Sequence, residues 1–177
     1  MTVQIEELSE RAGNELLAFE QENRAFFASV VPDRGDAYFV YDTFMENLKA
    51  LIEENGAGNS YMYTVRCEDN VIAGRINLVN VRTDSSGSKT AELGYRIGEA
   101  YKGKGYATAA IRLALAEAEK HRIVKVEAMT ASDNIGSQVV LMKNGFQQAG
   151  IRHGALHFEG NALDGIVYEK ILHESLK

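Results

Sequence analysis

A glycine-rich segment with two lysines is the part of this sequence best suited to hold a ligand. Its residues are Lys102, Gly103, Lys104, Gly105, Tyr106, Ala107 and Thr108. Glycines let a backbone approach a ligand closely, and unpaired N–H groups in the first turn of a helix lie at the positive end of its dipole. A phosphate or pyrophosphate suits such a site. The segment therefore predicts an anion-binding loop, with an ordinary turn carrying two solvated lysines as the alternative.

Two phosphate-binding motifs fit this segment only in part. Residues 98–104 match the first seven positions of a P-loop, but Gly105 stands where the motif needs the Ser or Thr that holds magnesium. The spacing of Gly103 and Gly105 resembles a dinucleotide fingerprint, but Thr108 replaces the third glycine. An NTPase is therefore disfavoured, whereas a dinucleotide-dependent oxidoreductase stays open as an alternative.

The elements around this segment predict a mixed α/β sheet. Strands are expected where β-branched and aromatic residues cluster, and helices where apolar residues recur at helical spacing. The expected strands cover residues 3–6, 61–67, 71–79, 90–97, 124–130, 147–158 and 163–172, and the expected helices cover residues 9–27, 41–54, 106–121 and 133–143. Ser9 is the expected N-cap of the first helix. One strand–helix–strand crossover lies among antiparallel strands, and the glycine-rich segment opens its helix.

Composition and cysteine usage indicate one domain, expected over residues 1–177. The chain is 45% hydrophobic and 25% charged, which is ordinary for a globular protein of this length. Cys67 is the only cysteine, so an internal disulfide is excluded and a reducing cytoplasm is expected. No apolar run is long enough for a membrane span, and the first residues do not resemble a signal peptide. We therefore expect a cytoplasmic protein without a membrane partner.

Charge is distributed unevenly along the chain. The net charge is −6, which argues against a nucleic-acid partner because neutralising phosphates normally needs a basic surplus. Residues 1–81 hold 6 basic and 14 acidic side chains, whereas residues 82–125 hold 9 basic and 5 acidic ones. A basic segment within an acidic protein suits a small polyanionic ligand, although solvated faces alone could produce the same pattern.

Four segments, in order, resemble one known family. The pattern Q/R-x-x-G-x-G/A at a strand-to-helix junction marks the acetyl-coenzyme A site of the GNAT superfamily of N-acetyltransferases, and residues 102–107 resemble it with lysine at the first position. Residues 91–97 are similar to the family's fourth strand, and residues 134–146 to its second cofactor-proximal segment. Residues 150–152 and 164–172 resemble the closing hairpin of the ribosomal-protein (alanine) N-acetyltransferase branch. The resemblance implies a mostly antiparallel, twisted central sheet flanked by helices.

The resemblance also implies acetyl-coenzyme A as cosubstrate, and no metal. Amides of the loop would hold its diphosphate, and backbone groups of strand four would meet the pantetheine and acetyl group. Gly94 would ease the bulge that the family carries in this strand. The implied cofactor-binding residues are Tyr95, Arg96, Ile97, Lys102, Gly103, Lys104, Gly105, Tyr106, Ala107, Thr108 and Asn134. His153 and His157 lack a third ligand near them in sequence, so a metal site is not expected.

Glu92 and Ser137 are the implied catalytic residues. An amine is mostly protonated at neutral pH, so a carboxylate, or a water that it orders, must take a proton before attack. Several family members hold a glutamate with this role at the position of Glu92. Many relatives place a proton-donating tyrosine where this sequence has Leu141, which cannot donate. In the ribosomal-protein branch that the sequence resembles, a serine matching Ser137 is the suggested donor to the departing thiolate, so the resemblance implies this role for Ser137. The alternatives are a salt-bridged strand glutamate at Glu92, a simple helix cap at Asn134 and protonation by water.

The implied reaction is acetyl transfer from acetyl-coenzyme A to a primary amine within a ternary complex. The favoured acceptor is the N-terminal α-amine of a protein, and the acidity of residues 1–81 favours a cationic one. A small amine, such as a polyamine, is one alternative. A catalytically silent, coenzyme A-binding regulatory module is another, because Leu141 replaces the common tyrosine. A homodimer stays open.

Overall fold

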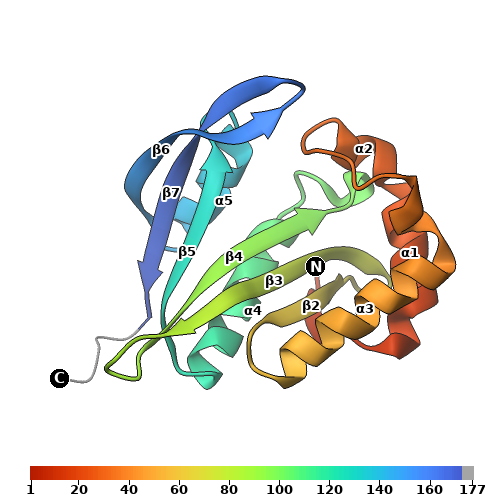
Figure 1. Cartoon of the computed structure of the whole chain (residues 1–177), viewed down its shortest axis with the longest axis horizontal. Coiled ribbons are helices and arrows are strands. Elements are labelled where there is room, and N and C mark those ends of the chain that lie inside the picture. The colour runs from red at the N-terminus through yellow and green to blue at the C-terminus, as the bar shows by residue number, and fades with distance from the viewer. Residues whose placement is uncertain (173–177) are drawn as a thin grey trace.

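The computed structural model describes residues 1–172, within which seven strands form one sheet in the order β1-β2-β3-β4-β5-β7-β6. All neighbouring strands are antiparallel except β4 and β5, which run parallel. The sheet is twisted and flanked by helices, as predicted (Figure 1). The strands are β1 (Gln4–Glu7), β2 (Tyr61–Arg66), β3 (Ile72–Thr83), β4 (Lys89–Ile97), β5 (Ile123–Ala131), β6 (Gln147–Phe158) and β7 (Asn161–Ile171).

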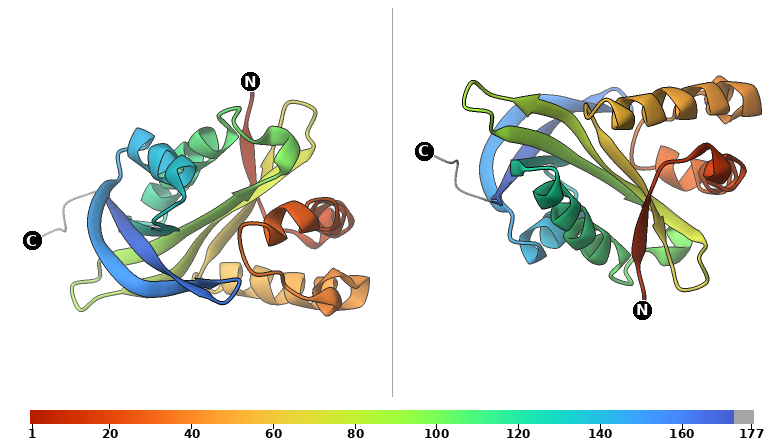
Figure 2. Two further views of the ribbon diagram at one scale, coloured as in Figure 1. Left: turned by 90° about the horizontal axis from the view of Figure 1, so that it is seen from above. Right: turned by 90° about the horizontal axis from the view of Figure 1, so that it is seen from below.

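Helices cover both faces of the sheet. One face carries α1 (Gly13–Glu22), α2 (Arg24–Ala28) and α3 (Tyr41–Gly56), and the other carries α4 (Tyr106–Lys120) and α5 (Ile135–Lys143) (Figures 1 and 2). The β6–β7 hairpin curves over the face that carries α1, α2 and α3 (Figure 2). Three short 3-10 helices are η1 (Glu10–Ala12), η2 (Asp36–Phe39) and η3 (Glu99–Tyr101). No helix within the described residues is long and apolar enough to cross a bilayer.

Alternation along the strands separates two apolar cores. Ile76 and Leu78 of β3 are fully buried on the α4 face, where Ala110 and Ala114 let that helix approach the sheet closely. The opposite core lies under α1 and α3 and contains Leu16, Phe19, Phe44, Leu48 and Met62. Because both cores share one sheet, the position of α4 relative to β4 is fixed, and with it the glycine-rich loop between them.

The helix expected over residues 9–27 is wrong in two respects. Ser9 makes no capping hydrogen bond, and the α-helical turns begin only at Gly13, after η1. The helix then breaks at Asn23, whose Nδ2 donates to the Phe19 carbonyl (2.9 Å) and whose Oδ1 accepts from the Glu99 N–H (2.9 Å). The bond to Glu99 ties α1 to η3, immediately before the glycine-rich loop.

The expected bulge at Gly94 is absent from the pairing of β4 with β3. Residues 92–97 of β4 pair continuously with residues 74–79 of β3, whereas the register shifts after Val79. Asn80, next in the chain, has a positive φ of 50°. Asparagine tolerates this left-handed conformation better than most residues, which places the irregularity on β3.

Candidate active site

The parallel strands β4 and β5 diverge part-way along their length. They pair from Lys89 to Glu92 and from Ile123 to Glu127, yet β4 continues to Ile97 and β5 to Ala131 (Figure 1). We call residues 93–97 and 128–131 the fork. Peptide groups of β4 in the fork have no partner on β5 and are therefore able to bind a ligand.

The loop before α4 presents a row of N–H groups without acceptors. Gly103 (φ +72°) and Gly105 (φ +87°) take the left-handed conformation that favours glycine. Within residues 1–172, none of the N–H groups of residues 103–108 donates a backbone hydrogen bond, whereas the Ala109 N–H bonds to the Gly105 carbonyl at 3.1 Å. A Cβ at position 103 would meet no atom within 4 Å. The start of this 15-residue helix therefore fits a diphosphate group.

Neighbouring side chains add charge to the loop and hold its shape. Lys102 Nζ lies 5.5 Å from the centre of the Phe26 ring, and Lys104 Nζ donates to the Ala100 carbonyl of η3 (2.9 Å). Tyr106 packs edge-on against a neighbouring tyrosine, and the Thr108 carbonyl accepts from an asparagine on the segment after α5. Both lysines are thus placed beside the loop, whereas Tyr106 and Thr108 mainly support it.

A hydrogen bond between two hydroxyl groups links the β4 side of the fork to α5. Tyr95 Oη of β4 and Ser137 Oγ of α5 are 2.8 Å apart, and either can donate. Asn134 Oδ1 accepts from the Ser137 N–H at 3.1 Å, so Asn134 is the N-cap of α5 and fixes the position of Ser137. Burial raises the pKa of Tyr95 above its ordinary value of 10.0, although the bond with Ser137 acts in the opposite direction. The pair is therefore protonated at neutral pH and able to donate.

Sequence reasoning found Ser137 but missed the side chain of Tyr95. Leu141, where many relatives hold a tyrosine, is 1% exposed and packs in the core. The phenol beside Ser137 comes instead from β4, 42 residues away in sequence. Alternation along β4 was the available signal, because it places Tyr95 on the same face as Ala91 and Leu93.

Glu92 lies where β4 and β5 still pair, at the closed end of the fork. It is three residues from Tyr95 and so points to the opposite face, which carries α1 and α3. Its carboxylate accepts from Asn80 Nδ2 (2.9 Å) and lies 3.6 Å from the Arg82 guanidinium, with the side chain 42% exposed. It borders an open groove of about 550 Å³, to which Glu54 also contributes. Its exposure suits a base, whereas its pairing with Arg82 also fits the structural alternative.

Arg96 and Ile97 contribute to the fork through their backbone. The Arg96 side chain turns towards α1, where Nη1 lies 3.3 Å from Glu20 and the guanidinium lies 4.6 Å from the centre of the Phe27 ring. Ile97 pairs with Gly74 of β3. No cluster of three or more His, Cys, Asp or Glu side chains that could hold a metal exists within residues 1–172.

The family model described as the acetyltransferase (GNAT) domain matches residues 8–147 of this chain. That range includes β4, the glycine-rich loop and all of α5. The chain belongs to the GNAT acetyltransferase family. The resemblance to this family is therefore confirmed, and this GNAT protein is an acetyltransferase. The dinucleotide-dependent oxidoreductase alternative is wrong.

Three known proteins are similar to this GNAT acetyltransferase over nearly its whole length. It is 29% identical over 164 residues to the probable N-acetyltransferase YjcK of Bacillus subtilis, covering 90% of this chain and 88% of that protein. A ribosomal-protein-S5-alanine acetyltransferase from Vibrio fischeri matches it with a TM-score of 0.91 at 21% identity, covering 100% and 97% of the two chains. RimL, a ribosomal L7/L12 α-N-protein acetyltransferase in complex with coenzyme A, matches with a TM-score of 0.85 at 19% identity, covering 97% and 94%. The two structural matches show a shared fold.

Proposed function

We propose that this enzyme transfers the acetyl group of acetyl-coenzyme A to the N-terminal α-amine of a protein. The observation that carries the proposal is the fork, which has the anion-binding loop and the Tyr95–Ser137 pair on one side and Glu92 on the other. Two structurally similar proteins are described as acetyltransferases of ribosomal proteins. A ribosomal-protein terminus as acceptor agrees with the cytoplasmic location expected from the sequence.

Donor binding falls to the backbone of the loop. Acetyl-coenzyme A supplies an activated acetyl thioester together with a diphosphate. N–H groups of residues 103–108 would hold the diphosphate, and Lys102 and Lys104 add long-range attraction. Unpaired peptide groups of β4 in the fork are suited to hold the pantetheine and to polarise the acetyl carbonyl.

Proton removal from the acceptor is assigned to Glu92. Its side chain lies on the face opposite Tyr95, so an acceptor that approaches from the α1 and α3 side meets Glu92 first. Three residues along a strand span roughly 10 Å, so a water ordered by the carboxylate would carry the proton from the amine. Direct attack by the neutral amine then needs no nucleophile from the enzyme.

Proton return to the departing thiolate is assigned to the Tyr95–Ser137 pair. Ser137 Oγ would donate, Tyr95 Oη would replace that proton across the 2.8 Å bond, and solvent would then reprotonate Tyr95. The pair compensates for Leu141, which cannot donate. This arrangement supports an active enzyme over a catalytically silent binding module.

The acceptor class is tested by free-thiol release with three kinds of amine. Peptides with free N-terminal alanine or serine should release thiol, whereas the same peptides with a blocked N-terminus should not. A polyamine serves as the small-molecule comparison. Faster thiol release with the polyamine, or equal release with the blocked peptides, would contradict transfer to the α-amine.

Sedimentation of the same material would show whether the enzyme is the homodimer that the sequence leaves open.

A further inference from the structure

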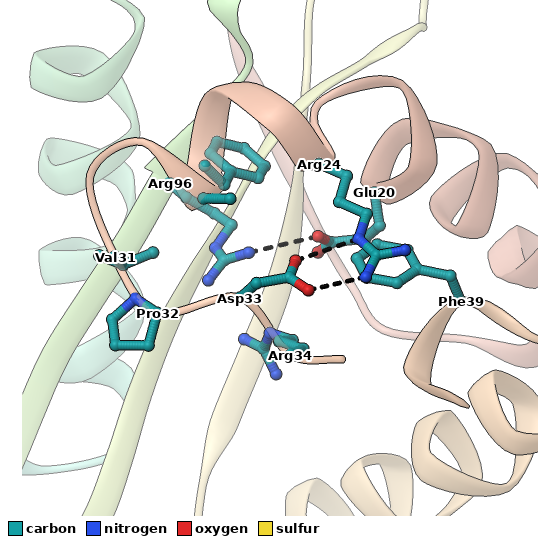
Figure 3. A pocket seen from close by; sticks show the side chains of 10 residues that line it. Glu20, Arg24, Val31, Pro32, Asp33, Arg34, Phe39 and Arg96 are labelled. Carbon is teal, nitrogen blue, oxygen red and sulfur yellow. Dashed lines mark hydrogen bonds and ion pairs between the residues drawn. The ribbon is translucent and has the colours of Figure 1, made fainter. Parts of the chain in front are cut away.

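Four arginines gather beside the fork on the face that the acceptor is proposed to approach. They are Arg24, Arg34, Arg75 and Arg96, and three of them line a narrow cavity between α1, α2 and the segment after α2 (Figure 3). The acidic side chains among them are Glu20, Asp33 and Asp36. Four guanidinium groups thus face three carboxylates.

Ion pairing within this cluster leaves a net positive charge. Glu20 is 1% exposed and is shared by Arg75 (2.9 Å) and Arg96 (3.3 Å). Arg24 binds both aspartates, at 2.7 and 2.8 Å. Arg34 lies over the Tyr38 ring, 4.8 Å from its centre, and forms no ion pair within residues 1–172. Burial lowers the pKa of Arg96, and the positive charges of Arg34 and Arg75 lower it further, whereas Glu20 opposes the shift. The unpaired positive charge of the cluster therefore acts on Arg96.

The surplus lies at the mouth of the cavity. The cavity is only about 10 Å³, roughly the volume of a single water, so a larger group would bind at the mouth. Arg34 is exposed there, and the Arg96 side chain is 23% exposed. Arg96 also belongs to the fork. Its guanidinium is therefore separated by no more than the length of a few residues from the β4 peptide groups that are proposed to polarise the acetyl carbonyl.

The surface between Arg96 and Glu92 is suited to a peptide backbone. On this face Gly94 has no atom within 4 Å of where its Cβ would stand. Gly94 is exposed, so an extended peptide could lie against this stretch of β4.

We propose that Arg34 and Arg96 form a subsite for a carboxylate that the acceptor carries close to its amine. The acceptor would then be a protein N-terminus with an acidic side chain among its first three residues. This inference rests on the proposed function and names its substrate class. It is opposite to the expectation of a cationic acceptor drawn from the summed charge of residues 1–81, because the nearest acidic side chains are already paired with arginines.

Three peptides that differ only at residue 2, which is Glu, Ala or Lys, test the inference. The wild type should acetylate the Glu peptide with a kcat/KM about tenfold above that of the Ala peptide, mainly through KM, because charged hydrogen bonds are stronger than neutral ones. Arg34→Gln should reduce this ratio at least about threefold, and salt should weaken the preference in the wild type. Arg11→Gln, which removes an exposed arginine outside the cavity, should leave the ratio unchanged.

Each other outcome has a distinct meaning. Equal kcat/KM for the three peptides, or a preference for the Lys peptide, would overturn the subsite while leaving N-terminal acetylation intact. An unchanged ratio in Arg34→Gln would overturn the assignment of Arg34. Absence of transfer to every peptide would overturn the proposed function and the subsite with it.

Discussion

At the residue scale, the proposed proton donor is a pair of hydroxyl groups, because Leu141 cannot donate a proton. Ser137 could be chosen from the sequence because of the resemblance to the ribosomal-protein branch. Alternation along β4 gives the face on which the Tyr95 side chain lies, but its contact with Ser137 depends on an approach between β4 and α5 that the sequence alone does not show. Glu92 was identified by its position in the strand, but whether it lies free or paired depended on Arg82, on a neighbouring strand.

Removing either hydroxyl of the pair tests proton return. Tyr95→Phe and Ser137→Ala should each lower kcat by about 10- to 100-fold with little change in coenzyme A affinity, because a positioned proton donor contributes mainly in the transition state. The double variant should lose little more than the worse single one, since both act on one proton. Steady-state kinetics check this, and fully additive losses would contradict a relay. Because burial raises the pKa of Tyr95, loss of its proton should not reduce kcat below about pH 10.

Glu92→Gln tests proton removal. We expect kcat to fall about 100-fold while the KM for acetyl-coenzyme A stays nearly constant, because a general base acts only on the acceptor. The matched control is Glu127→Gln, which changes the cross-strand neighbour that also lies near Arg82. A pH–rate profile unaltered in Glu92→Gln, or an equal loss in Glu127→Gln, would remove Glu92 as the base.

At the element scale, the glycine-rich loop lies where the sequence predicts it, at the start of α4, whereas the late start and the break of the first helix were not predicted. The loop could be predicted because a cluster of glycines followed by an alanine-rich helix is a local feature of the sequence. The break at Asn23 depends on Glu99, which is 76 residues away, so residue spacing within the helix carried no sign of it.

A pair of glycine variants separates binding from stability. Gly103→Ala and Gly87→Ala each place a Cβ at positive φ (72° and 86°) with no atom within 4 Å, so each should cost about 1 kcal/mol of stability. Only Gly103→Ala should weaken coenzyme A binding, about tenfold by calorimetry, because it distorts the amide row. Equal affinity in the two variants would show that the loop does not hold the diphosphate.

Asn23→Ala tests the junction of α1, α2 and η3. The variant removes two hydrogen bonds from a residue that is 8% exposed, which should lower the free energy of unfolding by about 2 kcal/mol. Gln21→Ala, which removes one exposed hydrogen bond, is the control and should change it by less than about 0.5 kcal/mol. Urea titration measures both, and similar values for the two would contradict the role given to Asn23.

At the scale of the whole molecule, the sequence predicted the fold class and the crossover, but not where β4 and β5 part. They part beyond Glu92 and Glu127, in a sheet that has helices on both faces and the β6–β7 hairpin curving over one of them (Figure 2). The charge near the proposed acceptor position could not be predicted either, because the total charge of a segment does not reveal which acidic side chains are neutralised by arginines. The proposed site is therefore a property of the assembled sheet, in which donor and acceptor would approach from opposite faces.

The affinity of a bisubstrate compound, in which the α-amine of a short peptide is joined to coenzyme A through an acetyl bridge, tests that central claim most directly. Such a compound would occupy both faces at once, so calorimetry should give a Kd at least about 100-fold below that of coenzyme A alone. The same compound joined through a lysine side chain at the peptide's far end should gain much less. A Kd no lower than that of coenzyme A for the α-amine compound would contradict the meeting of donor and acceptor at the fork.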